Sequence, residues 1–261
     1  MMLQNFAFLF AREISFLLLM PAAYVALGGH AVYAGSAPDY SDHQYYLHGN
    51  APWDEGRKLV NLAIEGGWRH TKGSAVIRVA VIDTNFECEH PDLPATYIVR
   101  DFVQDPDSGV NSTPPYYDTS PAKSAHGTAC AGLIFARNDG IGTCGIAPEC
   151  TPIYIRIQDA TLLPKAIRTA AELGARVISL SMQGHDVTDS KAVAEAATAV
   201  ITDYRCAIVV SGAEDVDDDH LCDVAGVIVV GGVDETDGQW SGDANDSEND
   251  FASGANIDLV A

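Results

Sequence analysis

Basic residues are scarce in this sequence. The 15 lysines and arginines stand against 36 aspartates and glutamates, which gives a formal net charge of −21. A chain with so few cations lacks the charge that holds phosphate backbones or anionic lipid headgroups. The composition therefore argues against nucleic acid and anionic membrane surfaces as partners, and it favours solubility, cation binding or life in high salt.

Long apolar runs are also lacking. The apolar run near the N-terminus, Ile14–Leu27, is interrupted by Pro21 and falls short of the roughly 20 residues that a membrane helix needs. An arginine before it and a small-residue site ending at Ala34 are typical of a secretory signal, which predicts residues 1–34 as a signal peptide. A buried core helix or a membrane anchor is the alternative. The expected location is secreted, extracellular or periplasmic, without membrane attachment after cleavage.

No C-x-x-C pair occurs among the six cysteines, and none of them has a histidine at zinc-finger spacing, so no metal cluster is expected. In an exported chain the even count favours disulfides. Short separations favour the pairs Cys144–Cys150 and Cys206–Cys222. Buried thiols are the alternative.

Apolar, β-branched runs alternate with helical patterns after a polar, aromatic segment, residues 35–73. The runs, typical of strands in a parallel sheet, are Val76–Ile82, Ile153–Ile157, Val177–Leu180, Ala207–Val210 and Val227–Val230. The helical patterns are Leu162–Leu173, whose Ala166, Ile167, Ala170 and Leu173 share a face, and Ser190–Ile201. Residues 74–261 therefore predict one three-layer α/β domain with a doubly wound, mostly parallel sheet.

Two residues are candidates for acid–base chemistry. Asp83 directly follows the first predicted strand, at the sheet edge where doubly wound folds place their sites, although a lone aspartate there is as readily a loop cap. His126 opens the run His126-Gly127-Thr128-Ala129-Cys130-Ala131-Gly132, whose small residues let a helix approach neighbouring backbone closely. We expect His126 at the start of that helix, over the same edge. A histidine whose ring an aspartate holds in one tautomer is a general base.

At these residues the chain resembles the subtilisin-like serine proteases (subtilases), whose catalytic residues occur in the order Asp, His, Ser. The run Val79-Ala80-Val81-Ile82-Asp83-Thr84, followed by His90-Pro91-Asp92-Leu93, resembles the aspartate motif, and the His126 run resembles the histidine motif. The resemblance implies peptide-bond hydrolysis, in which Asp83 orients the imidazole while His126 takes a proton from the serine and later gives it to the leaving amine.

The stretch Gly174–Gly184 resembles the helix end and the strand that bind substrate backbone by adding it to a sheet. The substrate-binding residues implied by this resemblance are Ser179, Leu180, Ser181 and Gly184. The implied partner is a peptide or a protein.

Two departures from the family pattern concern catalysis. The sequence contains no Gly-Thr-Ser nucleophile motif and ends with Asn256–Ala261, where that motif would follow, so we expect an incomplete domain that is inactive as given. Glu214 stands where the family has its oxyanion asparagine, and an ionised carboxylate cannot donate a hydrogen bond there. A fragment of an active protease and a non-catalytic peptide-binding or inhibitory pseudoprotease both remain open. A nucleotide-binding domain is disfavoured because Asp83-Thr84-Asn85-Phe86 contains no glycine-rich phosphate turn.

Acidic residues crowd into 214–219 and 234–250. Oxygen ligands so close together suit Ca²⁺, but the absence of EF-hand spacing favours solvated acidic loops, with a Ca²⁺ site as the alternative. No cofactor is expected to be required.

Overall fold

The computed structural model describes residues 26–27, 30–31, 39, 41, 44–48, 62, 64–109, 121–181, 190–212, 221–232 and 259–260. The strands are β1 (Ala26–Leu27), β2 (His30–Ala31), β3 (Arg78–Asp83), β4 (Ile98–Asp101), β5 (Thr151–Arg156), β6 (Ala175–Leu180), β7 (Ala207–Ser211), β8 (Val227–Gly231) and β9 (Leu259–Val260). The helices are α2 (Tyr45–His48), α3 (Ile64–Trp68), α4 (Pro121–Phe135), η3 (Ala160–Leu162), α5 (Leu163–Glu172) and α6 (Ser190–Asp203).

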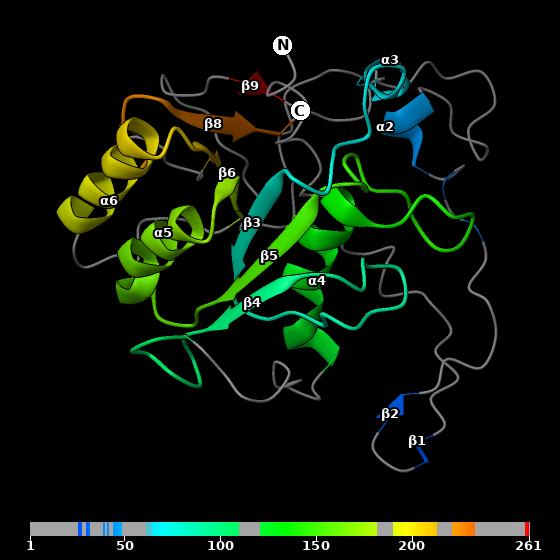
Figure 1. The fold of residues 1–261 in the computed structure, drawn as a ribbon, viewed down its shortest axis with the longest axis horizontal. Coiled ribbons are helices and arrows are strands. Elements are labelled where there is room, and N and C mark those ends of the chain that lie inside the picture. The colour runs from blue at the N-terminus through cyan, green and yellow to red at the C-terminus, as the bar shows by residue number, and fades with distance from the viewer. Residues whose placement is uncertain are drawn as a thin grey trace, which may run out of the picture.

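A seven-stranded sheet in the order β4-β5-β3-β6-β7-β8-β9 forms the centre of the molecule (Figure 1). Every pair in it is parallel. The chain enters at β3, builds β4 and β5 on one side, and then continues from β6 to β9 on the other. The predicted doubly wound parallel sheet is therefore confirmed, and the strand order reverses beside β3.

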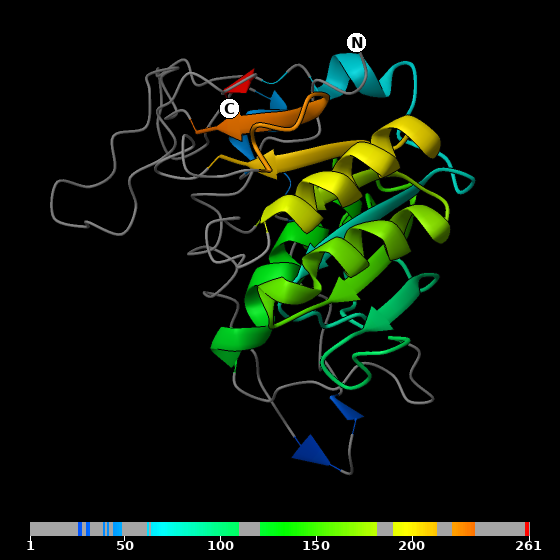
Figure 2. The same ribbon diagram turned by 90° about the vertical axis from the view of Figure 1, so that its left-hand side faces the viewer.

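Helices cover both faces of this sheet, as Figures 1 and 2 show, with α5 and α6 on one side and α4 on the other. Side chains alternate between the two layers along β3: Ala80 and Ile82 join the core beneath α5 and α6, whereas Val79 and Val81 join the core beneath α4. Of the helical face predicted from the sequence, Ala166, Ile167 and Ala170 have no exposed surface, whereas Leu173 follows the end of α5 and is only partly buried against the same core. The three-layer prediction is confirmed.

The five predicted strands are all present, with ends that differ from the structure by at most two residues, whereas β1, β2, β4 and β9 were not predicted. Val76 and Ile77 were expected in the first buried strand, but they are 83% and 37% exposed and precede β3. The edge strand β4 was not predicted, because its sequence Ile-Val-Arg-Asp has only two apolar residues and is mostly half-buried.

The disulfide prediction was wrong. All six cysteines are buried thiols, and none takes part in a disulfide. Cys206 and Cys222 both belong to the core beneath α5 and α6, where cysteine serves as a small apolar side chain. Burial raises the pKa of Cys206 to about 12 and that of Cys144 to about 11.

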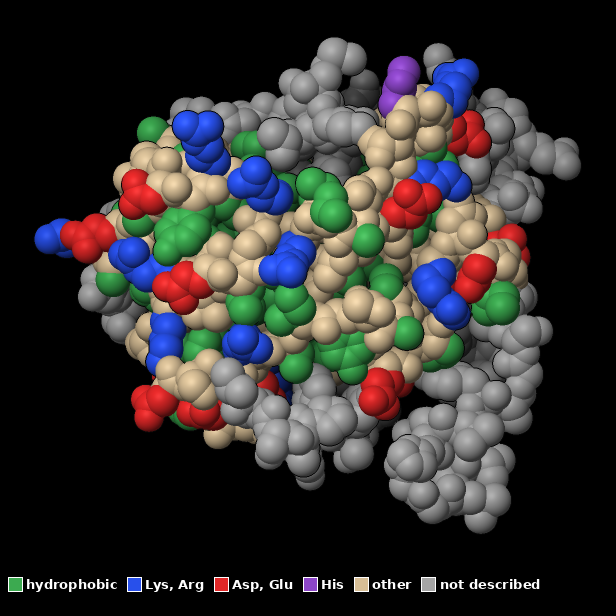
Figure 3. Space-filling model, in the orientation of Figure 1, with side chains coloured by type: hydrophobic (Ala, Val, Ile, Leu, Met, Phe, Trp, Pro, Cys, Tyr) green, Lys and Arg blue, Asp and Glu red, His purple; other side chains and the backbone are tan. Residues whose placement is uncertain are grey.

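Most of the predicted signal peptide, residues 1–34, lies outside the described residues. Its described part consists of β1 and β2, which pair antiparallel. Among the described helices, none has the length and apolar character needed to cross a membrane. On the face shown in Figure 3, Lys and Arg side chains are interspersed with Asp and Glu, so the negative net charge does not gather there into one acidic patch. The acidic stretches 214–219 and 234–250 lie outside the described residues, so solvated acidic loops stay a prediction and a Ca²⁺ site stays the alternative.

Candidate active site

Asp83 is the last residue of β3 and lies at the carboxyl edge of the sheet, where the strand order reverses. Its side chain is 1% exposed. The strand that carries it is held on both sides by ladders with β5 and β6. Its Oδ1 accepts a hydrogen bond of 2.7 Å from the backbone N–H of Thr84. Fixed backbone and a fixed carboxylate make Asp83 a rigid acceptor at this edge.

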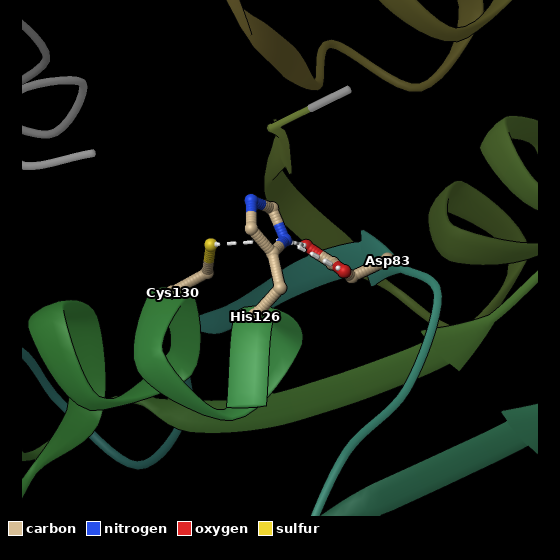
Figure 4. Close-up of side chains that lie close together, drawn as sticks. All are labelled: Asp83, His126 and Cys130. Carbon is tan, nitrogen blue, oxygen red and sulfur yellow. Dashed lines mark hydrogen bonds and ion pairs between the residues drawn. The ribbon is translucent and has the colours of Figure 1, made fainter. Parts of the chain in front are cut away.

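His126 lies within α4, which begins at Pro121, and not at the helix start as expected. The proline explains the earlier start, because its fixed φ and missing N–H suit the first turn of a helix. The imidazole Nδ1 lies 2.8 Å from Asp83 Oδ2 and 2.9 Å from Oδ1 (Figure 4). The side chain of His126 is 39% exposed, so one end of the ring is buried against Asp83 and the other faces outward.

The close approach of α4 to β3 depends on Gly127. A Cβ at this position would lie 2.2 Å from the backbone oxygen of Asn85 and 3.0 Å from Asp83 Cβ. Thr128 strengthens the same contact, because its Oγ1 accepts a 2.8 Å hydrogen bond from the Glu87 N–H. The expected close packing is therefore confirmed at Gly127, but Gly132 has no neighbour within 4 Å of a built Cβ and does not contribute to it.

The hydrogen bond that His126 donates to Asp83 raises the pKa of His126, and this effect outweighs the opposing effect of burial. An ionised carboxylate can only accept, so Nδ1 carries a proton in both charge states of the ring. In the neutral ring Nε2 is then left with its lone pair, and Figure 4 shows it pointing away from Asp83 and Cys130. The pair can therefore accept a proton at Nε2 and stabilise the imidazolium that results.

Replacing Asp83 with asparagine is expected to lower the pKa of His126, because the charged acceptor that raises it is removed. Because folding raises the pKa of His126 above its ordinary value of 6.5, the Asp83–His126 contact stabilises the folded protein most when the ring is protonated. This contribution to the free energy of unfolding is full below pH 6.5 and is lost as the pH rises through the pKa of the folded state. NMR titration of the His126 ring checks the first point, and unfolding at pH 5 and pH 8 checks the second. Asp139→Asn, at a surface ion pair with Arg137, is the control. An unchanged His126 titration in Asp83→Asn would contradict the assigned bond.

Ser179 and Leu180 lie inside the central strand β6 and not at a free edge. Ser179 pairs with Val81 of β3 and Val209 of β7, and Leu180 is flanked by the same two strands. Their backbone groups are therefore unavailable to a substrate strand, and a peptide could add only to residues after Leu180. Ser181 is the first of these, whereas Gly184 and Glu214 lie outside the described residues.

Sequence reasoning missed Cys130, whose Sγ lies 3.8 Å from His126 Nδ1 (Figure 4). Spacing could have revealed it, because side chains four residues apart share one face of a helix. Burial, with the nearby Asp83 charge second, raises the pKa of the Cys130 thiol well above its ordinary value. A buried thiol on the Nδ1 side of the ring is not placed to act as the nucleophile that Nε2 would activate.

Arg156 was also missed. Its Nη1 lies 3.1 Å from Asp101 Oδ2, and the two side chains are 6% and 0% exposed. Its Nε donates a 3.2 Å hydrogen bond to the backbone oxygen of Thr84, which directly follows Asp83. A buried ion pair thus holds an arginine that fixes the backbone directly after Asp83.

A buried aspartate that binds Nδ1 of a half-exposed histidine, at the carboxyl edge of a parallel sheet, is the arrangement of a serine protease's Asp–His pair. The family model described as the subtilase family matches residues 74–261. The chain belongs to this family of serine proteases.

Individual relatives agree with this assignment. Thermitase from Thermoactinomyces vulgaris is 30% identical over 145 residues, which are 52% of this chain and 48% of thermitase. Mycosin-4 from Mycobacterium tuberculosis is 33% identical over 168 residues, which are 56% of this chain and 34% of mycosin-4. The chain thus spans at most about half the length of these relatives.

Solved structures share the fold. MycP1 with its N-terminal propeptide removed matches with a TM-score of 0.57 and 20% identity, covering 76% of this chain and 67% of MycP1. The nisin leader peptidase NisP from Lactococcus lactis matches with a TM-score of 0.55 and 19% identity, covering 78% of this chain and 65% of NisP.

Proposed function

We propose that this chain is a secreted subtilisin-like endopeptidase domain in which Asp83 and His126 supply the aspartate and histidine of the catalytic triad. The observation that carries the proposal is the Nδ1–carboxylate contact of 2.8 Å on a ring whose Nε2 faces outward. In this role His126 takes the proton of a serine hydroxyl through Nε2 and returns it to the leaving amine, while Asp83 stabilises the imidazolium.

The 261 residues contain no Gly-Thr-Ser motif, so we propose that this chain alone does not hydrolyse peptides. A non-catalytic peptide-binding or inhibitory module is the second candidate, and Glu214 favours it, because a carboxylate at the oxyanion position would oppose the developing negative charge. In both cases the bound peptide would add as a strand to the segment that begins at Ser181. We propose no required cofactor, and we propose solvated acidic loops for the stretches 214–219 and 234–250, with a Ca²⁺ site there as the alternative.

The test begins with the codons that follow Ala261. If an in-frame Gly-Thr-Ser motif occurs there, the extended product should react with a serine-directed fluorophosphonate, and His126→Ala should abolish that reaction. If a stop codon occurs there, the 261-residue chain should bind unlabelled peptides, measured by fluorescence polarisation, without cleaving them. Labelling that survives His126→Ala would overturn the catalytic role of the pair. Hydrolysis by the 261-residue chain itself would overturn the proposed inactivity.

A further inference from the structure

We infer that Asp101 is a positioning residue: it holds the guanidinium of Arg156 away from Asp83, so that both oxygens of that carboxylate stay available to the imidazole. These three residues end the neighbouring strands β4, β5 and β3 (Figure 1). In the two parallel ladders Arg156 is the register partner of both aspartates. The three side chains therefore form one row across the carboxyl edge of the sheet, the edge row.

The edge row lies on the face of the sheet that α4 covers. The residues two positions before its members all belong to the core beneath α4, and they are Val99, Tyr154 and Val81. Because side chains alternate between the two faces along a strand, the members of the edge row point to that layer too. His126 enters the same layer from α4 and contacts Asp83. With the ring protonated, charges therefore alternate along the edge in the order aspartate, arginine, aspartate, histidine.

Arg156 lies between two carboxylates and pairs with only one of them. Its Nη1 lies 3.1 Å from Asp101 Oδ2, whereas no ion pair joins it to Asp83 in the described part of the chain. Asp101 is itself fixed, because its Oδ1 accepts hydrogen bonds of 3.0 and 3.2 Å from two backbone N–H groups of the turn after β4. Asp83 presents both oxygens to the ring of His126, at 2.9 and 2.8 Å from Nδ1.

Burial makes this choice of partner matter. The side chains of Arg156 and Asp101 are 6% and 0% exposed, so a charge left alone at either position would be costly. A guanidinium without Asp101 would therefore turn to the other carboxylate of the edge row, Asp83. Its charge-assisted hydrogen bonds would then compete with the imidazole for the same oxygens. Asp101 thus preserves the acceptor to which His126 donates.

Few other charges act on this carboxylate. The titratable and charged groups that face Asp83 in the described part of the chain are His126 and Cys130 from α4 and Arg156 from β5. Burial, with the Asp83 charge second, raises the pKa of the Cys130 thiol well above its ordinary value, so the thiol stays neutral. Arginine keeps its charge at every pH at which the protein folds. The position of the guanidinium is therefore what can change the charge that the ring experiences.

The arrangement strengthens His126 as a base. The hydrogen bond that the ring donates to Asp83 raises its pKa, and a guanidinium on the same carboxylate would weaken that effect. Asp101 thus acts on the proton acceptor through Arg156. Its effect on catalysis rests on the proposed function, but its effect on the ring does not.

The experiment is an NMR titration of the His126 ring in the 261-residue chain and two variants, Asp101→Asn and Arg156→Met/Asp101→Asn. Asparagine keeps an oxygen for the two backbone N–H groups that Asp101 binds, so the single variant should fold. We expect the pKa of His126 to fall in Asp101→Asn, with a proton affinity roughly threefold lower or more, because Arg156 then binds Asp83. In the double variant it should return close to the wild-type value, because the competing guanidinium is gone.

The pair of variants separates competition between charges from a loosened structure. If Asp101 acted only by packing, the double variant, which loses more contacts, would lower the pKa of His126 at least as far as the single one. That result, or an unchanged titration in Asp101→Asn, would overturn the inference. Asp105→Asn is the control, because this exposed aspartate lies in the same turn but outside the edge row, and it should titrate like the wild type.

A second readout does not depend on the double variant. In Asp101→Asn, nuclear Overhauser contacts between the Arg156 guanidinium and the His126 ring should appear, because the arginine has moved to the carboxylate that the ring contacts. A lowered pKa without these contacts would also count against the inference.

A separate arm uses any extended product that hydrolyses peptides. The acid limb of its kcat/KM profile should move to lower pH in Asp101→Asn, by the same amount as the ring titration, because that limb reports the base of the free enzyme. No hydrolysis by any extended product would sink the proposed function and leave the effect on the ring standing. Hydrolysis by an enzyme whose ring titrates alike in wild type and Asp101→Asn would do the reverse.

Discussion

Arg156→Met is expected to lower the free energy of unfolding by about 3–5 kcal/mol, because removing one partner of a buried ion pair leaves the other charge buried alone. The charge left behind is Asp101, whose side chain is fully buried at the end of β4. The variant also removes the hydrogen bond to the Thr84 carbonyl, so the turn behind Asp83 loses its brace. Urea denaturation followed by circular dichroism measures the change.

The double variant Arg156→Met/Asp101→Asn separates the ion pair from the packing of the arginine stem. Asparagine keeps an oxygen to accept the N–H groups of Val103 and Gln104, which Asp101 Oδ1 binds now, but carries no charge. The double variant should therefore be more stable than Arg156→Met alone, because it leaves no unpaired buried charge, although a second side chain has been changed. Additive losses would show that the two charges do not stabilise each other.

Much of the fold could be predicted because its sheet is buried on both faces. Strands covered by helices on both sides must be apolar throughout, and such runs stand out in a sequence. The strand β4 escaped because an edge strand can carry charge, and in Arg100 and Asp101 it does. The disulfides were predicted from an even count, but the count alone does not distinguish paired cysteines from cysteines that fill a core.

The candidate site could be predicted only in part, for a similar reason. Asp83 and His126 stand in motifs that mark the sheet edge, so each was found from its own neighbours. Arg156 was not, because its role comes from Asp101 in a strand that the sequence did not reveal. The lack of a free edge at Ser179 follows from strand order, which periodicity does not determine.

Gly127→Ala is expected to destabilise the protein by about 3 kcal/mol, at the upper end of the usual cost of overpacking. The added Cβ would lie 2.2 Å from the Asn85 carbonyl oxygen, and a backbone atom cannot rotate away as a side chain can. Helix α4 must then move off β3, which lengthens the contact between His126 and Asp83. We therefore expect the pKa of His126 to fall together with the free energy of unfolding, and NMR titration and urea denaturation measure the two effects.

Gly132→Ala provides the matched control, since it makes the same change in the same helix. No atom outside the adjoining backbone of α4 lies within 4 Å of a Cβ built at Gly132, so alanine gains the ordinary helix preference of about 1 kcal/mol over glycine without a clash. The two substitutions should thus change stability in opposite directions, and only Gly127→Ala should alter the His126 titration. If both variants were stabilised alike, α4 would not be held against β3 at Gly127, and the geometry of the Asp83–His126 pair would need another cause.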